Sequence, residues 1–349
     1  MKNQETLTGD VRSKASVGRM ASHAMKVEDF HSKLTSYSAC RLAGRMAIHA
    51  MKVEDFHSKE ARTVQELQIA GLSCSLLLPK GYDTGTDRWP VLYINGEIPV
   101  AEIMAALDKA KIPAQFILVA VRPESWNDDF TPWSAPSFRK GEMPPQGRAK
   151  RYLGRLTEEI KPYIDANYRT QPSPEHTALF GHSLGGLTAL YSMYETDRFG
   201  WIGSLSGSLW YDGFCEFMEE KSLLRPEGNV YLSLGKKESQ SRDPRMRRVG
   251  ECTKRAKEIL EERLTGAGSL GVGSLVSFGE ICASERYRTG EVCLEWNEGG
   301  HFHDMAGRFA RAIAWIVQGA DPMCYTDSKR AANGIQTDHR IATAQMEDF

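Results

Sequence analysis

A serine stands at the centre of the pentapeptide Gly181-His182-Ser183-Leu184-Gly185, between an apolar run and a segment with helical periodicity. Where a strand turns sharply into a helix, the residues two before and two after the central one must be small so that strand and helix can pass. Such a turn places a serine hydroxyl above the sheet edge, beside helix N–H groups that favour negative charge. The pattern predicts that Ser183 is the nucleophile of an acyl transfer, the alternative being an ordinary tight turn.

A serine nucleophile needs a base, and the positions of the histidines narrow the choice. Of the nine histidines, five lie in polar segments near the two ends of the chain. His176 precedes the predicted strand and His182 adjoins the serine, so neither can reach the hydroxyl from a separate loop. His301 and His303 both follow the last predicted strand, in a glycine-containing loop. We predict that His301 is the base, with His303 as the alternative.

The third member of such a site is a carboxylate that orients the imidazole and stabilises its cation. The segment NVYLSLGKKESQSRD, residues 229–243, ends a predicted strand and carries two acids. Glu238 is the first choice and Asp243 the second, and a solvated surface charge is the alternative role for Glu238. The oxyanion would be held by the N–H of Leu184 and by a second N–H after VLYING, from Gly96 or Glu97.

Aromatic and basic residues near these segments are candidates for the substrate pocket. Trp210 and Tyr211 follow one predicted strand and Trp133 lies on the loop after another, so their rings are expected to flank an acyl group, with core packing as the alternative. The basic run SFRKGEMPPQGRAKR, residues 137–151, could receive an anionic substrate or be a solvated face.

The elements that must position these residues follow from apolar periodicity, which alternates between short and long segments. Strand, helix, strand, helix in succession predicts a parallel sheet covered by helices, here begun by an antiparallel hairpin. The predicted strands are 64–71, 74–81, 89–96, 114–121, 177–180, 201–207, 229–235 and 291–296, and the predicted helices are 101–110, 149–168, 247–264, 304–317 and one after Gly186.

The domain organisation is predicted from length and from a repeat. The segment GRMASHAMKVEDFHSK at 18–33 returns with one change at 44–59, and two short polar copies cannot build a repeat architecture. We therefore expect residues 1–63 to be an extension that is disordered or artefactual. Residues 321–349 are expected to form a polar tail, which leaves one α/β catalytic domain at 64–320.

Composition limits the partners. The 44 basic and 45 acidic residues nearly cancel, so neither nucleic acid nor a membrane surface is an expected partner. No window is apolar enough to span a membrane or to act as a signal peptide, and a cytoplasmic location is expected. Seven scattered cysteines contain no C-x-x-C pair, which favours reduced thiols over a zinc site. We expect no metal and no cofactor, while composition does not predict the oligomeric state.

Four motifs resemble those of the esterase family that includes esterase D, feruloyl esterase modules and, most closely, the iron-siderophore esterases that hydrolyse enterobactin and salmochelin. They are GHSLGGL at 181–187, SGSLWY at 206–211, DDFTPW at 128–133 and GGH at 299–301, and the likeness covers about 64–320. The resemblance implies an α/β-hydrolase fold, with a mostly parallel central sheet and helices on both faces. It also implies ester hydrolysis with Ser183 as nucleophile, His301 as base and, where an acid is present, Glu238.

Two departures from the family pattern bear on mechanism and substrate. Some siderophore esterases work with a serine–histidine dyad, so Glu238 is not required by the resemblance. An arginine that many relatives carry near the acidic residues is replaced here by Arg122, further upstream in RPESWNDDFTPW.

The predicted function is therefore a serine hydrolase of a small-molecule carboxylic ester, with an enterobactin-like siderophore as the substrate that the resemblance suggests. The alternatives are an acyltransferase, a feruloyl or acetyl carbohydrate esterase on the same fold, and a non-catalytic ligand-binding module.

Overall fold

The computed structural model describes residues 63–264 and 290–318. These residues lie in the second of the two compact units of the chain, Met1–Ala61 and Arg62–Phe349. Apart from Thr63, the predicted extension 1–63 with its duplicated segments lies outside the described residues, as does the predicted tail 321–349.

The described residues form one eight-stranded sheet in the order β1-β2-β4-β3-β5-β6-β7-β8. The β2 strand runs antiparallel to both of its neighbours, and the other pairs are parallel. The hairpin between β1 and β2 turns through Ala70 and Gly71, both with positive φ, as a tight two-residue turn requires. The mostly parallel α/β fold predicted from sequence is confirmed. The strands are Val64–Ile69 (β1), Leu72–Leu77 (β2), Val91–Asn95 (β3), Ile117–Val121 (β4), Thr177–His182 (β5), Trp201–Leu205 (β6), Asn229–Gly235 (β7) and Val292–Asn297 (β8).

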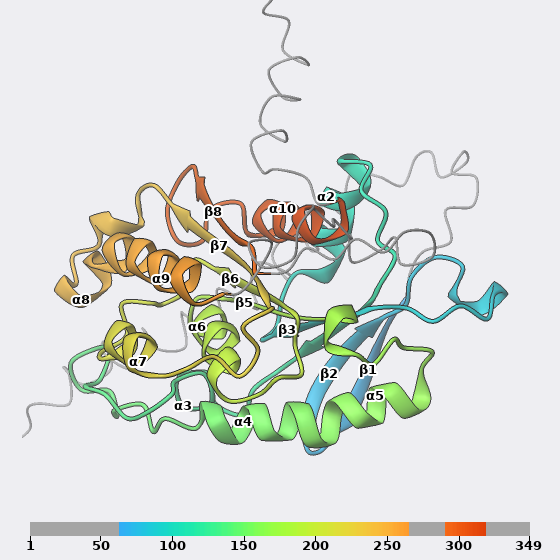
Figure 1. The fold of residues 1–349 in the computed structure, drawn as a ribbon, viewed down its shortest axis with the longest axis horizontal. Helices are drawn as coiled ribbons and strands as arrows, with labels where there is room; N and C mark the ends of the chain where they lie inside the picture. Colours follow the sequence, from blue (N-terminus) through green and yellow to red (C-terminus); the bar gives the residue numbers. More distant parts are fainter. Residues whose placement is uncertain (1–62, 265–289, 319–349) are drawn as a thin grey trace, which may run out of the picture. The chain divides into compact units, whose positions relative to one another are not determined.

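Helices cover both faces of this sheet, with α2 and α10 on one side and α4 and α5 on the other (Figure 1). Side chains along β3 alternate between the two cores, because successive residues of a strand point to opposite faces. Val91 and Tyr93 join the core beneath α4, α5, α6, α7 and α9, whereas Leu92 and Ile94 join the core beneath α2 and α10. The helices of seven or more residues are Val100–Lys109 (α2), Ala149–Arg155 (α4), Lys161–Asn167 (α5), Leu184–Tyr191 (α6), Phe214–Glu220 (α7), Val249–Arg263 (α9) and Met305–Gln318 (α10).

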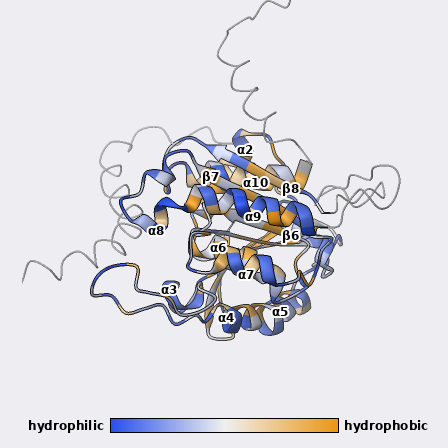
Figure 2. Ribbon diagram, turned by 60° about the vertical axis from the view of Figure 1, so that its left-hand side comes forward, coloured by the Kyte–Doolittle hydropathy of each residue, from blue (hydrophilic) through white to orange (hydrophobic). Residues whose placement is uncertain are grey.

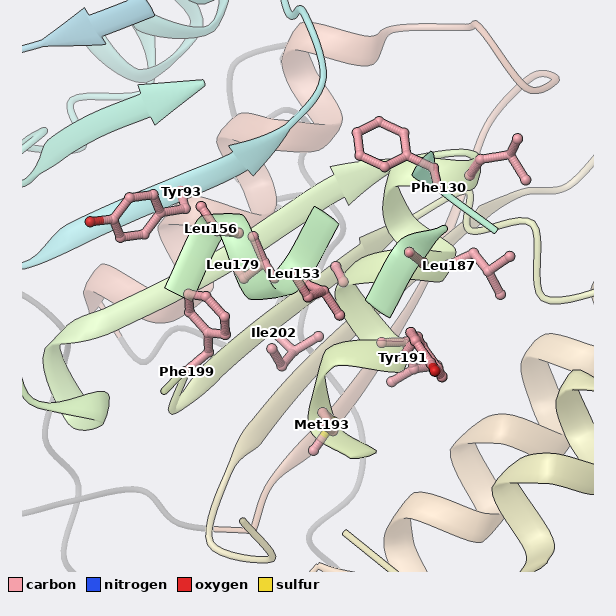
Figure 3. Packing of buried hydrophobic residues seen from close by; sticks show 14 of the residues in the cluster. Tyr93, Phe130, Leu153, Leu156, Leu179, Leu187, Tyr191, Met193, Phe199 and Ile202 are labelled. Atoms are coloured by element: carbon pink, nitrogen blue, oxygen red, sulfur yellow. The ribbon is translucent and has the colours of Figure 1, made fainter. Parts of the chain in front are cut away.

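The helix predicted over 149–168 is continuous but not uniformly α-helical. Leu156–Ile160 adopts a π-helical turn between α4 and α5, a local widening that periodicity alone does not predict. The buried stripe still packs on the sheet, and Figure 3 shows Leu153 and Leu156 in the same cluster as Tyr93, Leu179 and Ile202.

Short helices were not predicted, because segments of three to seven residues carry little periodicity. Several of them lie in the connections that follow β4, β6 and β7. The longest of these short helices is α7. In Figure 2, α9 alternates hydrophilic and hydrophobic residues, as expected for a helix with one buried side. No helix in the described ranges is long and apolar enough to cross a membrane. The other short helices are α3 (Trp126–Asp129), α8 (Pro244–Arg247) and the 3₁₀ turns Tyr82–Thr84, Pro174–His176, Ser192–Tyr194 and Glu238–Gln240.

Candidate active site

The turn between β5 and α6 has the strained geometry that its glycines predict. Ser183 has φ 59° and ψ −124°, a backbone conformation that non-glycine residues rarely adopt. A Cβ atom on Gly181 would lie 2.2 Å from the carbonyl oxygen of Gly185, and one on Gly185 would lie 2.9 Å from the carbonyl oxygen of Asn95. Both glycines are therefore required for strand and helix to pass.

Two buried side chains hold this turn from the neighbouring strand and helix. Asn95, the last residue of β3, donates from Nδ2 to the carbonyl of Gly185 at 3.0 Å and accepts from the hydroxyl of Tyr152 at 2.9 Å. Buried polar groups of this kind rigidify a site when their hydrogen bonds are satisfied. Sequence reasoning missed both residues. The only available signal was a polar residue, Asn95, at the end of an otherwise apolar strand.

The imidazole of His301 lies between Ser183 and Glu238. Its Nε2 is 2.9 Å from Ser183 Oγ, and its Nδ1 is 2.7 Å from Glu238 Oε2. Because a carboxylate only accepts, Nδ1 carries the hydrogen and Nε2 is left to accept the serine proton. His303 is exposed and packs beside Gly299, where a Cβ would approach its ring to 2.4 Å. The structure thus brings His301, not His303, to the serine.

Glu238 is buried, so it is not the solvated surface charge that its neighbours in sequence suggested. Its Oε1 accepts hydrogen bonds from Ser206 Oγ at 2.7 Å and from the Gly235 N–H at 2.6 Å, which leaves Oε2 for His301. Burial alone would raise the pKa of Glu238, but the hydrogen bonds from His301, Ser206 and Gly235 outweigh it and lower the pKa to about 2. The group is therefore a carboxylate at neutral pH.

Asp243, the second choice for the acid, has a different role. It is the N-cap of α8, and its side chain accepts from the backbone N–H groups of Arg245 and Met246. A side chain that caps a helix in this way satisfies donors that have no partner within the helix. The structure assigns Asp243 to that cap rather than to His301.

The donors predicted for the oxyanion divide into two groups. Leu184 is the first residue of α6, so its N–H has no partner within the helix and lies next to Ser183. The N–H of Gly96 instead donates to the carbonyl of Val121 at 2.8 Å, which corrects its prediction as an oxyanion donor. Gly96 has φ +100°, and a Cβ there would lie 2.7 Å from the ring of Trp126. Glycine at this position therefore allows the Trp126 ring to pack against the backbone. Glu97, exposed on the same loop, remains the candidate for the second N–H.

The three aromatic residues predicted to line the pocket belong to a packed cluster. Tyr211 is 2% exposed and Trp210 is 8% exposed, so both are core residues and not open pocket walls. Trp133 is partly buried, its ring lies 5.2 Å from that of Phe217, and its Nε1 donates to the carbonyl of Asp212 at 2.8 Å. The hydroxyl of Tyr211 donates to the carbonyl of Trp133. Packing, the alternative considered for each ring, accounts for these contacts.

One residue of the basic run at 137–151, Arg148, is engaged in internal ion pairs. Arg148 pairs with Asp129 at 3.0 Å and with Asp128 at 3.4 Å, which also explains the acidic residues of the DDFTPW motif. These charges tie the loop after β4 to the start of α4. Arg122 lies outside this run, at the carboxyl end of β4; its side chain is 63% exposed and lies 3.8 Å from Glu97.

His182 packs against His301. Its ring centroid lies 4.7 Å from that of His301, and its Nε2 donates to the His301 carbonyl at 2.9 Å. Burial, with the neighbouring His301 adding to it, lowers the pKa of His182 to about 3. His182 is therefore neutral at pH 7 and supports the loop that carries His301.

This buried histidine predicts a loss of stability in acid. The unfolded chain binds a proton at this residue below about pH 6.5, whereas the folded chain does so only near pH 3, so stability is lost as the pH falls from 6.5 towards 3. We expect His182→Gln to reduce the loss between pH 7 and pH 5 by about 1–2 kcal/mol. Urea unfolding at pH 7 and at pH 5 measures the free energy of unfolding of each protein, and His303→Gln, at an exposed histidine, is the control. Equal losses in wild type and His182→Gln would contradict the prediction.

Comparison with known proteins places the chain in a family. The model of the family described as "Putative esterase" matches residues 71–268. YbbA of Bacillus subtilis (strain 168), described as uncharacterized, is 28% identical over 195 residues, which cover 54% of this chain and 78% of that protein.

Two solved structures share the fold. An IroE-like serine hydrolase from Shewanella oneidensis has a TM-score of 0.55 at 18% identity, covering 73% of this chain and 80% of that one. The siderophore hydrolase EstA from Aspergillus nidulans has a TM-score of 0.52 at 16% identity, covering 78% and 99% respectively. The chain therefore belongs to this esterase family of α/β-hydrolase fold and is a carboxylic ester hydrolase.

Proposed function

We propose that this esterase is a serine hydrolase with Ser183 as nucleophile, His301 as general base and Glu238 as the acid that orients the base. One observation carries the proposal: the hydrogen-bonded chain from Glu238 Oε2 to His301 Nδ1 at 2.7 Å and from His301 Nε2 to Ser183 Oγ at 2.9 Å. Both distances lie in the range that links a nucleophile to its base and the base to its orienting group.

The reaction begins with acylation. His301 Nε2 takes the proton of Ser183 as Oγ attacks the ester carbonyl, and Glu238 stabilises the imidazolium. The N–H of Leu184 and, in this proposal, that of Glu97 stabilise the oxyanion of the tetrahedral intermediate. The intermediate collapses as His301 gives its proton to the leaving alcohol. Water then attacks the acyl-enzyme with His301 again as base, releasing the acid and restoring Ser183.

The first test is covalent labelling of the serine. A fluorophosphonate is expected to add one phosphonyl group to Ser183, located by peptide mass spectrometry, and to stop hydrolysis of p-nitrophenyl acetate in step with labelling. Heat-unfolded protein is the control, because activation of the serine depends on the folded site. Hydrolysis that continues after complete labelling would contradict the proposal. Binding of an ester without turnover would favour a non-catalytic module.

We further propose that the natural substrate is a siderophore ester. The fold likeness to a siderophore hydrolase supports this choice, as does the exposed Arg122 at the carboxyl edge of the sheet, where an anionic ferric catecholate complex would meet a cation. A small-molecule ester is the only partner that the mechanism requires.

A substrate panel tests this second proposal. A triscatecholate trilactone, with and without iron, is compared with methyl ferulate and an acetylated sugar, each also with an added acceptor alcohol. We expect the highest kcat/KM for the lactone, reduced several-fold in Arg122→Gln at low ionic strength but not in Arg139→Gln. A preference for ferulate or acetyl sugar, or predominant transfer to the alcohol, would overturn it in favour of a carbohydrate esterase or an acyltransferase.

A further inference from the structure

A fully buried arginine lies behind the proposed catalytic residues. The side chain of Arg308, on α10, is 0% exposed. Burying a guanidinium is costly unless its charge and N–H groups are matched. Here Nη1 lies 3.1 Å from Glu238 Oε1 and also donates to Ser206 Oγ, while Nη2 donates to the carbonyl of Gly300 at 2.9 Å.

These contacts join three segments that are separate in sequence. Ser206 directly follows β6, Glu238 lies in the turn after β7, and Gly300 precedes His301 in the turn after β8. One guanidinium therefore connects the carboxylate that orients the base with the peptide that carries the base. The planar fork of arginine can reach both at once, whereas the ammonium of lysine is a single point of charge.

The end of β7 is shaped to admit this side chain. A Cβ on Gly235 would lie 2.7 Å from Arg308 Nη2 and 2.9 Å from Glu238 Oε1. Glycine at this position leaves space for the ion pair. Since the carboxylate is planar, holding Oε1 with Arg308, Ser206 and the Gly235 N–H directs Oε2 towards His301.

We propose that Arg308 is a positioning residue for ester hydrolysis: it holds Glu238 and the Gly300 peptide so that His301 stays within hydrogen-bond distance of Ser183. The inference rests on the proposed function of these three residues. Arg308 acts through them and does not contact the reacting atoms.

The test measures kcat and KM for p-nitrophenyl acetate from pH 5 to pH 9 in two variants. Arg308→Lys keeps the charge and loses the fork, so kcat is expected to fall about 10–100-fold with an unchanged acid limb of the pH profile. Arg308→Met also loses the cation that opposes the imidazolium, so the acid limb is expected to move to higher pH by about one unit. KM is expected to change little in both.

Arg311 supplies the matched control. It lies three residues further along α10, its side chain is 12% exposed, and it pairs with Glu295 at 2.8 Å and Asp304 at 3.1 Å. Arg311→Lys and Arg311→Met are expected to lower thermal stability but to leave kcat within about two-fold of wild type and the pH profile unmoved. If the role of Arg308 were purely structural, its variants would likewise lose thermal stability while keeping kcat and the pH profile of wild type.

The outcomes separate this inference from the proposed function. Folded Arg308→Lys with wild-type kcat and pH profile would overturn the positioning role, even where activity depends on Ser183. Retained activity in Ser183→Ala would instead overturn the proposed function. Circular dichroism establishes that each variant is folded, and Arg308→Lys decides the question if Arg308→Met does not fold.

Discussion

Replacing Ser183 by alanine is expected to lower kcat/KM for p-nitrophenyl esters by about 10⁴-fold or more while leaving the protein folded. In the proposed mechanism this hydroxyl forms the acyl bond, and its oxygen lies 2.9 Å from His301 Nε2. Alanine keeps the Cβ that the strained turn already accommodates at φ 59°. Continuous measurement of p-nitrophenol release gives kcat/KM, and circular dichroism on the same sample shows whether the variant is folded.

The matched control is a buried serine at the other end of the same helical segment. Ser192 Oγ donates to the carbonyl of Ala189 at 2.7 Å, so Ser192→Ala removes a hydrogen bond without touching the reacting atoms. We expect a small loss of stability and an unchanged kcat/KM. If Ser183→Ala keeps more than about one tenth of wild-type activity after purification from a host lacking esterases, the nucleophile is another group.

The second large effect is expected for Glu238→Gln, which preserves shape and removes charge. The amide can present its NH₂ group to His301 Nδ1, which favours the tautomer with hydrogen on Nε2, and that tautomer cannot accept the serine proton. It also leaves the buried Arg308 guanidinium without its carboxylate. We expect kcat to fall by about 10²–10⁴-fold with a much smaller change in KM.

This experiment decides between a triad and a serine–histidine dyad. In a dyad, Glu238 would be dispensable and kcat would stay within about ten-fold of wild type. Glu298→Gln is the control, since Glu298 is an exposed acid in the same region that pairs with Lys236. Because the folded pKa of Glu238 is about 2, wild-type activity should show no titration of this group between pH 4 and pH 9.

Much of the fold was predictable because the periodicity that defines each element is local. The apolar runs that became β3 to β7 are short and buried on both faces, and helices lie between most of them, which is the pattern of a parallel sheet. The π-helical turn at Leu156–Ile160 and the short helix α7 were not predictable in this way, since they depend on packing against distant segments.

The sequence by itself determined the succession of strands and helices along the chain and the esterase family. It also singled out Ser183, His301 and Glu238, because turn glycines, strand ends and the order of these residues along the chain can be recognised in the sequence. Only the tertiary structure decided which of the candidate groups are buried or already hydrogen-bonded to other parts of the protein. The N–H of Gly96 is bonded to Val121, and the ring of Tyr211 is buried. Arg308, more than a hundred residues from Ser183 in the chain, lies against Glu238. Burial and hydrogen-bond pairing arise between segments that are remote in sequence, so no local pattern encodes them.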